Sequence, residues 1–231
     1  MTSDDEKRAA ALAALDYVED GMRIGLGTGS TARHFVEVLA GRVTQQGWKL
    51  TCVPTSEATR LQAEGLGLTL STLDENPILD LAVDGADEID GKLNLIKGGG
   101  GALLREKIVA TSAKQMIVIA DRSKRVATLG RFPLPVEVIP FGYKATARKI
   151  DQAFGWAGCK GAMTLRVRKG KVFATDNGNV ILDCALARID NPEKLGAALS
   201  SIPGIVEHGL FIAIATLSLI GTASGVQRIE R

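Results

Sequence analysis

The chain has 231 residues, of which 45% are hydrophobic and 23% are charged. These fractions are typical of an ordinary globular protein and exclude an intrinsically disordered chain. The 28 basic and 26 acidic residues are interleaved along the sequence, so no basic stripe predicts a nucleic-acid partner.

Local composition also disfavours secreted and membrane proteins. Residues 2–6 are mostly acidic, whereas a secretory signal begins with basic residues. The apolar stretch at residues 210–223 is interrupted by Thr216 and Ser218 and is too short to cross a bilayer. We therefore expect a cytoplasmic protein with no membrane partner.

The cysteines and histidines predict no metal centre. Cys52, Cys159 and Cys184 are scattered and odd in number, so we expect reduced thiols in the core. His34 and His208 are the only two histidines, which excludes a histidine-rich metal site.

The first part of the chain alternates helical and strand patterns. Ser3 and Glu6 are spaced as a capping box, and a helical pattern follows as far as Gly21. Predicted helices at residues 31–42, 56–64 and 102–113 then separate predicted strands at residues 22–26, 50–53, 79–83 and 116–120. Because parallel strands need such crossover connections, the pattern predicts a parallel, doubly wound sheet.

The pattern changes after residue 131. Pro133 and Pro135 lack a backbone N–H and predict that no central strand runs here. We then expect a helix at 143–154, strands at 163–167, 171–175 and 180–184, a helix at 192–199 and a strand at 205–207. This order predicts a small α+β domain inserted before the chain returns to the first domain.

Polar residues follow the predicted parallel strands at the point where each strand ends. Open parallel sheets bind ligands beyond these carboxyl ends. If the sheet is parallel, five turns that follow proposed strands share one edge of it: residues 27–31, 54–57, 84–88, 97–101 and 121–124.

The first of these turns, Gly27-Thr28-Gly29-Ser30-Thr31, predicts a phosphate site. Unpaired backbone N–H groups and the helix dipole favour an anion at a helix start. The alternative is that these residues only cap a helix. A dinucleotide site is disfavoured because no acidic residue stands at the ribose-binding spacing, and a P-loop is disfavoured because its lysine is missing.

The acidic stretch at residues 84–90 contains Asp84, Asp87, Glu88 and Asp90. A solvated turn or a weak Mg²⁺ or Ca²⁺ site would also explain it. Asp84 directly follows an apolar run, however, and a charge at the carboxyl end of a buried strand favours a functional role.

Four consecutive glycines, residues 98–101, follow Lys97 and precede a helix that carries Glu106. Glycines in series cost backbone entropy, so we expect a ligand or another backbone to approach closely. A carboxylate here could face the crevice while loop N–H groups bind a developing oxyanion. A Glu106–Lys107 surface pair is the alternative explanation.

Together these features predict proton transfer on a phosphorylated carbonyl compound. A carboxylate removes the proton next to the carbonyl, and the loop and the lysine stabilise the resulting enediolate. This chemistry needs no redox cofactor and no metal.

Six motifs, in this order over nearly the whole chain, resemble the A-type ribose-5-phosphate isomerases. They are GLGTGSTA (25–32), DGADEI (84–89), KGGGGALLREKI (97–108), FPLPVEVIP (132–140), TDNGNVILD (175–183) and IPGIVEHGLF (202–211). The resemblance implies a Rossmann-like catalytic domain, residues 1–130 and 208–231, with a small ferredoxin-like lid at residues 131–207. It also implies a metal-independent enediol mechanism, a sugar-phosphate substrate, and a homodimer or homotetramer.

The resemblance further assigns roles to individual residues. Glu106 would be the base that moves the proton between C1 and C2, Asp84 would assist ring opening and proton shuttling with Asp87 beside it, and Lys97 would stabilise the enediolate. The substrate-binding residues would be Lys7, Thr28, Gly29, Ser30, Thr31, Gly98, Gly99, Gly100 and Lys124.

Two other function classes remain possible from the sequence. A sugar-phosphate sensor domain needs the phosphate site but not the base, and no helix-turn-helix segment is evident beside it. A CoA transferase with a glutamate nucleophile is disfavoured because the chain leaves little room for a CoA-binding platform.

Overall fold

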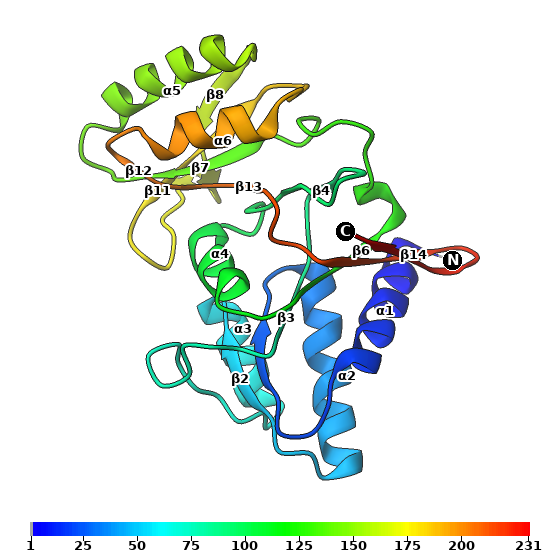
Figure 1. The fold of residues 1–231 in the computed structure, drawn as a ribbon. Coiled ribbons are helices and arrows are strands. Elements are labelled where there is room, and N and C mark those ends of the chain that lie inside the picture. The colour runs from blue at the N-terminus through cyan, green and yellow to red at the C-terminus, as the bar shows by residue number, and fades with distance from the viewer. Residues whose placement is uncertain (1) are drawn as a thin grey trace. The chain divides into compact units, whose positions relative to one another are not determined.

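The computed structural model describes residues 2–231, and these residues form two compact units (Figure 1). The parallel-sheet unit contains residues 2–86, Arg105–Arg125 and Ala213–Arg231. The small-sheet unit contains Asp87–Leu104 and Val126–Ile212. The small-sheet unit contains the predicted lid, residues 131–207. It also contains residues 87–104, 126–130 and 208–212.

The parallel-sheet unit is built on six strands in the order β15-β14-β6-β3-β1-β2. Five of them are parallel, and β15 pairs antiparallel with β14 at one edge. Their bounds are β1 Arg23–Leu26, β2 Thr51–Pro54, β3 Leu81–Asp84, β6 Met116–Asp121, β14 Leu217–Thr222 and β15 Gly225–Glu230. This mostly parallel sheet confirms the predicted α/β class.

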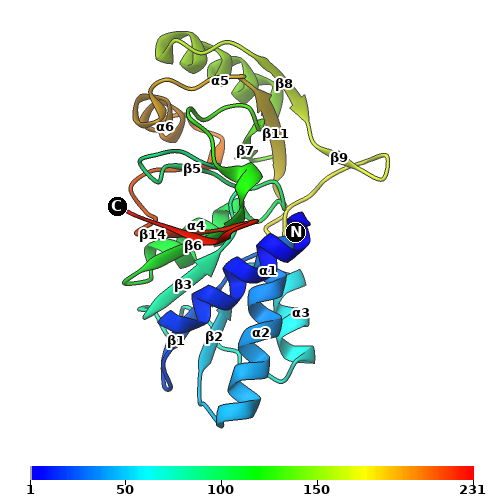
Figure 2. The same cartoon turned by 90° about the vertical axis from the view of Figure 1, so that its right-hand side faces the viewer.

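Helices cover both faces of this sheet. Three of them, α1 (Ser3–Ala14), α2 (Ser30–Gln46) and α3 (Glu57–Gly65), lie side by side (Figure 2) and share one apolar core with the sheet residues Leu81 and Val83. Helix α4 (Leu103–Thr111) packs Val109 against Ala82. Because neighbouring residues of a strand point to opposite faces, α4 lies on the other face of the sheet.

Helix α1 starts one residue earlier than its predicted capping box. The N-cap is Thr2, whose side chain accepts a hydrogen bond from the N–H of Asp5, while the Asp5 carboxylate accepts one from the N–H of Thr2. The prediction that Ser3 and Glu6 form the capping box was therefore wrong. Glu6 is buried instead, and its carboxylate accepts a hydrogen bond from the backbone N–H of Arg122 at 3.4 Å.

The small-sheet unit contains a four-stranded antiparallel sheet in the order β12-β7-β11-β8. Helices α5 and α6 connect its strands in the βαββαβ sequence of a ferredoxin-like fold, and a short β9–β10 hairpin (Figure 2) follows β8. The bounds are β7 Leu134–Val138, α5 Tyr143–Ala157, β8 Ala162–Leu165, β9 Val167–Arg168, β10 Lys171–Val172, β11 Val180–Ala185, α6 Pro192–Ser200 and β12 Ile205–His208.

Strand β7 corrects the expectation that prolines exclude a central strand. It contains Pro135 and lies between β11 and β12. The Pro135 carbonyl accepts a hydrogen bond from Gly209 N at 2.8 Å, and Gly209 directly follows the end of β12 at His208. Because the N–H and C=O of one residue point to the same side in an antiparallel sheet, the missing N–H of Pro135 also faces this side, beyond the end of β12. The ladder to β11 on the other side therefore loses no hydrogen bond.

The strand before the glycine run corrects a second expectation. Strand β5 (Leu95–Ile96) pairs antiparallel with β4 (Glu88–Ile89) and β13 (Leu210–Phe211) in a three-stranded sheet of the small-sheet unit. Only four of the five predicted turns thus follow parallel strands. A two-residue apolar segment carries no signal that separates the two kinds of pairing.

The three cysteines are free and buried, as expected. Burial raises the pKa of the Cys52 thiol to about 12, so this thiol is not a nucleophile at neutral pH. Among residues 2–231, no helix has both the length and the apolar character that a membrane crossing requires.

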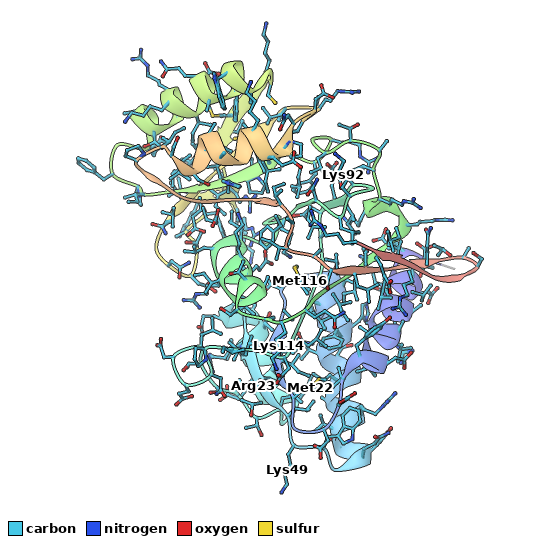
Figure 3. All side chains as sticks on the ribbon, in the orientation of Figure 1. Met22, Arg23, Lys49, Lys92, Lys114 and Met116 are labelled. Atoms are coloured by element: carbon cyan, nitrogen blue, oxygen red, sulfur yellow. The ribbon has the colours of Figure 1, made fainter. Side chains whose placement is uncertain are left out.

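The amino end of the parallel sheet is closed by an ion cluster (Figure 3). Asp80, just before β3, accepts hydrogen bonds from Arg23 Nε at 3.2 Å and Lys114 Nζ at 2.8 Å. The hydrogen bonds from Arg23 and Lys114 hold the pKa of Asp80 well below its usual range. Arg23 and Lys114 are therefore already paired with Asp80. A phosphate site needs positive charges that are not neutralised in this way.

Acidification tests this cluster. A depressed carboxyl pKa contributes stability that is complete above the unfolded pKa of about 4 and is lost as pH falls toward the folded value. Asp80→Asn should lower the urea midpoint at pH 7, and its difference from the parent should shrink below about pH 4. The exposed Asp74→Asn is the control; an Asp80→Asn deficit that stays constant from pH 7 to pH 2 would contradict the ion-cluster account.

Gly221 tests how closely α1 packs on β14. A Cβ at Gly221 would lie 1.9 Å from the Glu6 carbonyl oxygen, whereas nothing lies within 4 Å of a Cβ at Gly41 in α2. Gly221→Ala should destabilise the protein by about 1–3 kcal/mol through overpacking, and Gly41→Ala should stabilise it by about 0.5–1 kcal/mol. Urea unfolding measures both, and equal effects would refute this packing.

Candidate functional site

Asp84 ends strand β3 and is 3% exposed. Its Oδ1 accepts hydrogen bonds from Gly85 N at 2.7 Å and from Thr28 N at 3.1 Å. Two backbone N–H groups thus fix the carboxylate beside the turn that follows β1.

Two glycines of β1 and the turn after it make room for this arrangement. A Cβ at Gly27 would lie 2.1 Å from Asp84 Oδ1, and a Cβ at Gly25 would lie 2.4 Å from Cγ1 of Val109 on α4. The sequence did not predict this role for either glycine, because it indicated a phosphate site at the turn. They allow a carboxylate and a helix to approach the strand closely.

Glu106 lies in the first turn of α4 and is 3% exposed. It lines the same small pocket as Asp84, together with Gly27 and Thr55. The structure therefore brings together the two carboxylates that the sequence assigned to proton transfer. The alternative reading of Glu106 as a solvated surface pair is wrong, because the side chain is buried.

The predicted phosphate turn leads into α2. The N-cap is Gly29, which has φ 119° and no side chain, so no side-chain cap hydrogen bond protects the first N–H groups of the helix. The proposal that these residues serve only as a cap is thereby disfavoured. Ser30 is exposed and Thr31 is buried at this helix start.

A cluster of hydroxyl groups braces the same turn and was missed by the sequence analysis. The Thr28 hydroxyl contacts those of Thr55, Ser56 and Thr59 at 2.7, 2.8 and 3.0 Å. The Thr59 hydroxyl also donates to the Gly27 carbonyl at 3.0 Å. Hydroxyl residues directly after the carboxyl ends of the adjacent parallel strands β1 and β2 are the signal that could have identified the cluster.

The two lysines assigned to the phosphate share a neighbour. Burial works against ionisation of Asp121, yet hydrogen bonds from Ser123 and the charges of Lys124 and Lys7 lower its pKa overall. Lys7 on α1 and Lys124 after β6 are thus close enough to act on one carboxylate. Both are only partly exposed.

The starts of α1 and α2 also lie next to each other. His34 Nε2 is 3.0 Å from Asp4 Oδ1. Asp4 is three residues before Lys7, and His34 is four residues after Ser30. The uncapped N–H groups at the start of α2 and Lys7 on α1 therefore lie in the same region of the parallel-sheet unit.

The glycine run and Lys97 belong to the small-sheet unit. Lys97 is 2% exposed, and its Nζ lies 5.5 Å from the centre of the Phe211 ring. Gly99 N donates to Asp87 Oδ2 at 2.7 Å. Asp87 therefore holds the backbone of the glycine loop, a contact that the sequence did not reveal.

Two other carboxylates of the acidic stretch have structural partners. Glu88 accepts hydrogen bonds from Gly130 N and Phe132 N, both at 2.7 Å. Asp90 accepts from the backbone N–H of Lys92 and of Asn94, both at 2.8 Å. Within residues 2–231, no three His, Cys, Asp or Glu side chains are grouped so that they could hold a metal ion.

Comparison with known proteins identifies the family of the chain. Residues 51–225 match the family described as ribose 5-phosphate isomerase A, or phosphoriboisomerase A. Ribose-5-phosphate isomerase A of Nitrobacter hamburgensis is 59% identical, with complete coverage of both chains.

Two solved structures extend the similarity. A D-ribose-5-phosphate isomerase in complex with phospho-erythronic acid is 40% identical with a TM-score of 0.92, and 100% of each chain is covered. Ribose 5-phosphate isomerase from Plasmodium falciparum is 37% identical with a TM-score of 0.94, over 99% of each chain. The chain therefore belongs to the ribose-5-phosphate isomerase A family.

Proposed function

We propose that the protein interconverts ribose 5-phosphate and ribulose 5-phosphate through an enediolate, with Glu106 as the general base and without a metal. The observation that carries this proposal is the shared pocket of Asp84 and Glu106 at the carboxyl end of β3. Family membership supplies the substrate, and the buried carboxylates support the mechanism.

The residues assigned to the reaction are near neighbours along the chain. Asp84 and Asp87 are three residues apart, so their Cα atoms are at most about 11 Å apart. Helix α4 begins two residues after the glycine run and carries Glu106 in its first turn. We therefore propose that the glycine loop and Lys97 act on the same substrate as Asp84 and Glu106.

In the open-chain aldose, the Glu106 carboxylate takes the proton from C2. The electron pair of the broken C–H bond forms the C1–C2 double bond, and the C1 carbonyl oxygen becomes the oxyanion. A proton then moves from the C2 hydroxyl to the C1 oxygen, and Glu106 returns its proton to C1. The product is the ketose.

The neighbouring groups have separate tasks in this scheme. Asp84 assists ring opening and moves the proton between the two oxygens, with Asp87 beside it. The ammonium group of Lys97 and the N–H groups of Gly98 and Gly100 stabilise the oxyanion, while the N–H of Gly99, the third glycine assigned to the substrate, donates to Asp87 and holds the loop. Fixed donors are effective there because they need no reorganisation when the charge develops.

The substrate phosphate is assigned to the start of α2. The uncapped N–H groups after Gly29 and the helix dipole favour an anion. Ser30 and Thr31 add hydroxyl donors, and the charges of Lys7 and Lys124 add attraction. Thr28 serves the turn itself, since its hydroxyl contacts three other hydroxyls.

The wider setting completes the proposal. We infer a cytoplasmic homodimer or homotetramer without a nucleic-acid or membrane partner, and residues 131–207 as a lid that excludes water from the enediolate. We also infer that phospho-erythronic acid binds this chain as it does the solved relative, because its carboxylate carries charge where the enediolate oxygens form.

Glu106→Gln tests the base. The amide keeps the shape of the side chain but cannot accept the proton, so kcat should fall by about 10²–10⁴ while KM changes little. The measurement is ketose formation from ribose 5-phosphate in the presence of a chelator. Glu64→Gln, on the exposed face of α3, is the matched control; a Glu106→Gln enzyme with the parent rate would exclude Glu106 as the base.

Lys124→Met tests the phosphate site. Removing one ammonium group should raise KM for ribose 5-phosphate and weaken inhibition by inorganic phosphate by about 10-fold, since charged hydrogen bonds contribute about 1.5–3 kcal/mol. Lys49→Met removes an exposed charge near the amino end of β2, where Lys49 is visible at the foot of Figure 3, and should change neither. Equal inhibition of the parent and Lys124→Met by phosphate would refute the assignment.

A further inference from the structure

Arg166 is an arginine of the small-sheet unit whose side chain is only 9% exposed. It directly follows β8, and its guanidinium is bound in fork geometry by Asp183 on β11, through Nε to Oδ2 at 2.8 Å and through Nη2 to Oδ1. Paired contacts of this kind fix both the position and the plane of the guanidinium. Asp183 leaves one side of the guanidinium, Nη1, for another partner.

That remaining nitrogen binds the glycine loop. Arg166 Nη1 donates to the Gly98 carbonyl at 2.7 Å and to the Gly99 carbonyl at 3.3 Å. Arg168 Nη2 adds hydrogen bonds to the carbonyls of Gly99 at 3.1 Å and Gly100 at 3.0 Å. Three successive carbonyls of the loop are consequently held by two arginines.

The geometry of the peptide group turns this contact into a constraint on the N–H groups. In a trans peptide the C=O and the following N–H point in opposite directions. The N–H groups of Gly99 and Gly100 must therefore face away from the arginines. That of Gly99 donates to Asp87 at 2.7 Å, while among residues 2–231 no acceptor of the protein binds the N–H of Gly100.

The same region explains why the loop stays in place. Phe173 lies under both guanidinium groups, at 6.0 Å from Arg166 and 4.2 Å from Arg168. A Cβ at Gly101 would be 2.5 Å from this ring, and Gly98 and Gly101 have φ values of 100° and 90°. Glycine at these two positions lets the loop fit against the ring and adopt a backbone that other residues rarely adopt.

We propose that Arg166, held by Asp183, is a positioning residue for the isomerisation: by fixing the carbonyls of Gly98 and Gly99 it aims the Gly100 N–H at the enediolate oxygen. This inference rests on the proposed function. Arg166 acts through the loop and does not touch the substrate. Its effect should therefore appear where negative charge has developed, and not in the binding of the neutral sugar carbonyl.

Arg166→Lys keeps the positive charge but loses the fork that binds Asp183 and the loop at once. We expect kcat to fall by about 10- to 100-fold, because misplaced oxyanion donors lose most of their effect. KM for ribose 5-phosphate should stay within about threefold, whereas the affinity for phospho-erythronic acid should fall by about the same factor as kcat.

Chemical rescue adds a second readout. In Arg166→Ala, added guanidinium at millimolar concentration should restore part of kcat by occupying the vacated place beside Asp183, and ammonium should not. Arg188→Lys alters an exposed Arg–Asp pair of the same unit, Arg188 Nε to Asp190 Oδ1 at 2.6 Å, and should leave kcat unchanged. Circular dichroism and thermal unfolding measure the folded fraction of every variant.

The outcomes separate the inference from the proposed function. A parent protein that does not isomerise ribose 5-phosphate contradicts the proposed function. An active parent with an equally active Arg166→Lys contradicts only the role of Arg166. Loss of kcat that merely follows loss of folded protein, in Arg166→Lys and in the milder Asp183→Asn, would assign the pair to folding and overturn the inference.

Discussion

The carboxylate of Asp84 occupies the space that a side chain at Gly27 would need. This close approach sets the arrangement of the first half of the site. It lets the backbone N–H groups of Thr28 and Gly85 bind the carboxylate, and Gly25 on the same strand lets α4 approach with Glu106. Any side chain larger than hydrogen at Gly27 would displace the carboxylate or the turn, so the positions of Asp84 and of this turn depend on the contact.

A second constraint acts on the glycine loop of the small-sheet unit. Asp87 holds one edge of the loop through the N–H of Gly99, and Arg166 holds the other edge through the carbonyls. The run of glycines thereby takes a defined conformation in which the N–H of Gly99 is bound to Asp87 and that of Gly101 to the Gly98 carbonyl. Fixing donors before the reaction is what makes them useful to a charged intermediate, because the cost of ordering is met during folding.

Much of the fold was predictable because its signals are local. Alternating strand and helix patterns predicted the parallel sheet, whereas the order expected after residue 131 lacked strand β7, because its prolines were taken to exclude a central strand. The catalytic candidates were predictable for a related reason: Asp84 and Glu106 adjoin apolar elements, where an unpaired charge is costly and therefore indicates a candidate functional residue. Their shared pocket confirms that they lie together.

Other features depend on tertiary contacts that no local pattern encodes. Pro135 lies in a central strand because its missing N–H falls where the neighbouring strand has ended. Glu88 resembled Asp84 in the sequence, yet it binds the N–H groups of Gly130 and Phe132, more than forty residues away. Arg166 contacts a loop 68 residues earlier in the chain.

In the proposed reaction a carboxylate moves a proton through an enediolate, without transfer of hydride. Isomerisation of ribose 5-phosphate in D₂O with a chelator, followed by NMR of the product, tests it most directly. Solvent deuterium should appear at C1 of ribulose 5-phosphate when the reaction is held at equilibrium, because the proton on Glu106 can exchange with water between or during many reversible turnovers. Equilibrium with no deuterium at C1 after many turnovers would contradict proton transfer through Glu106.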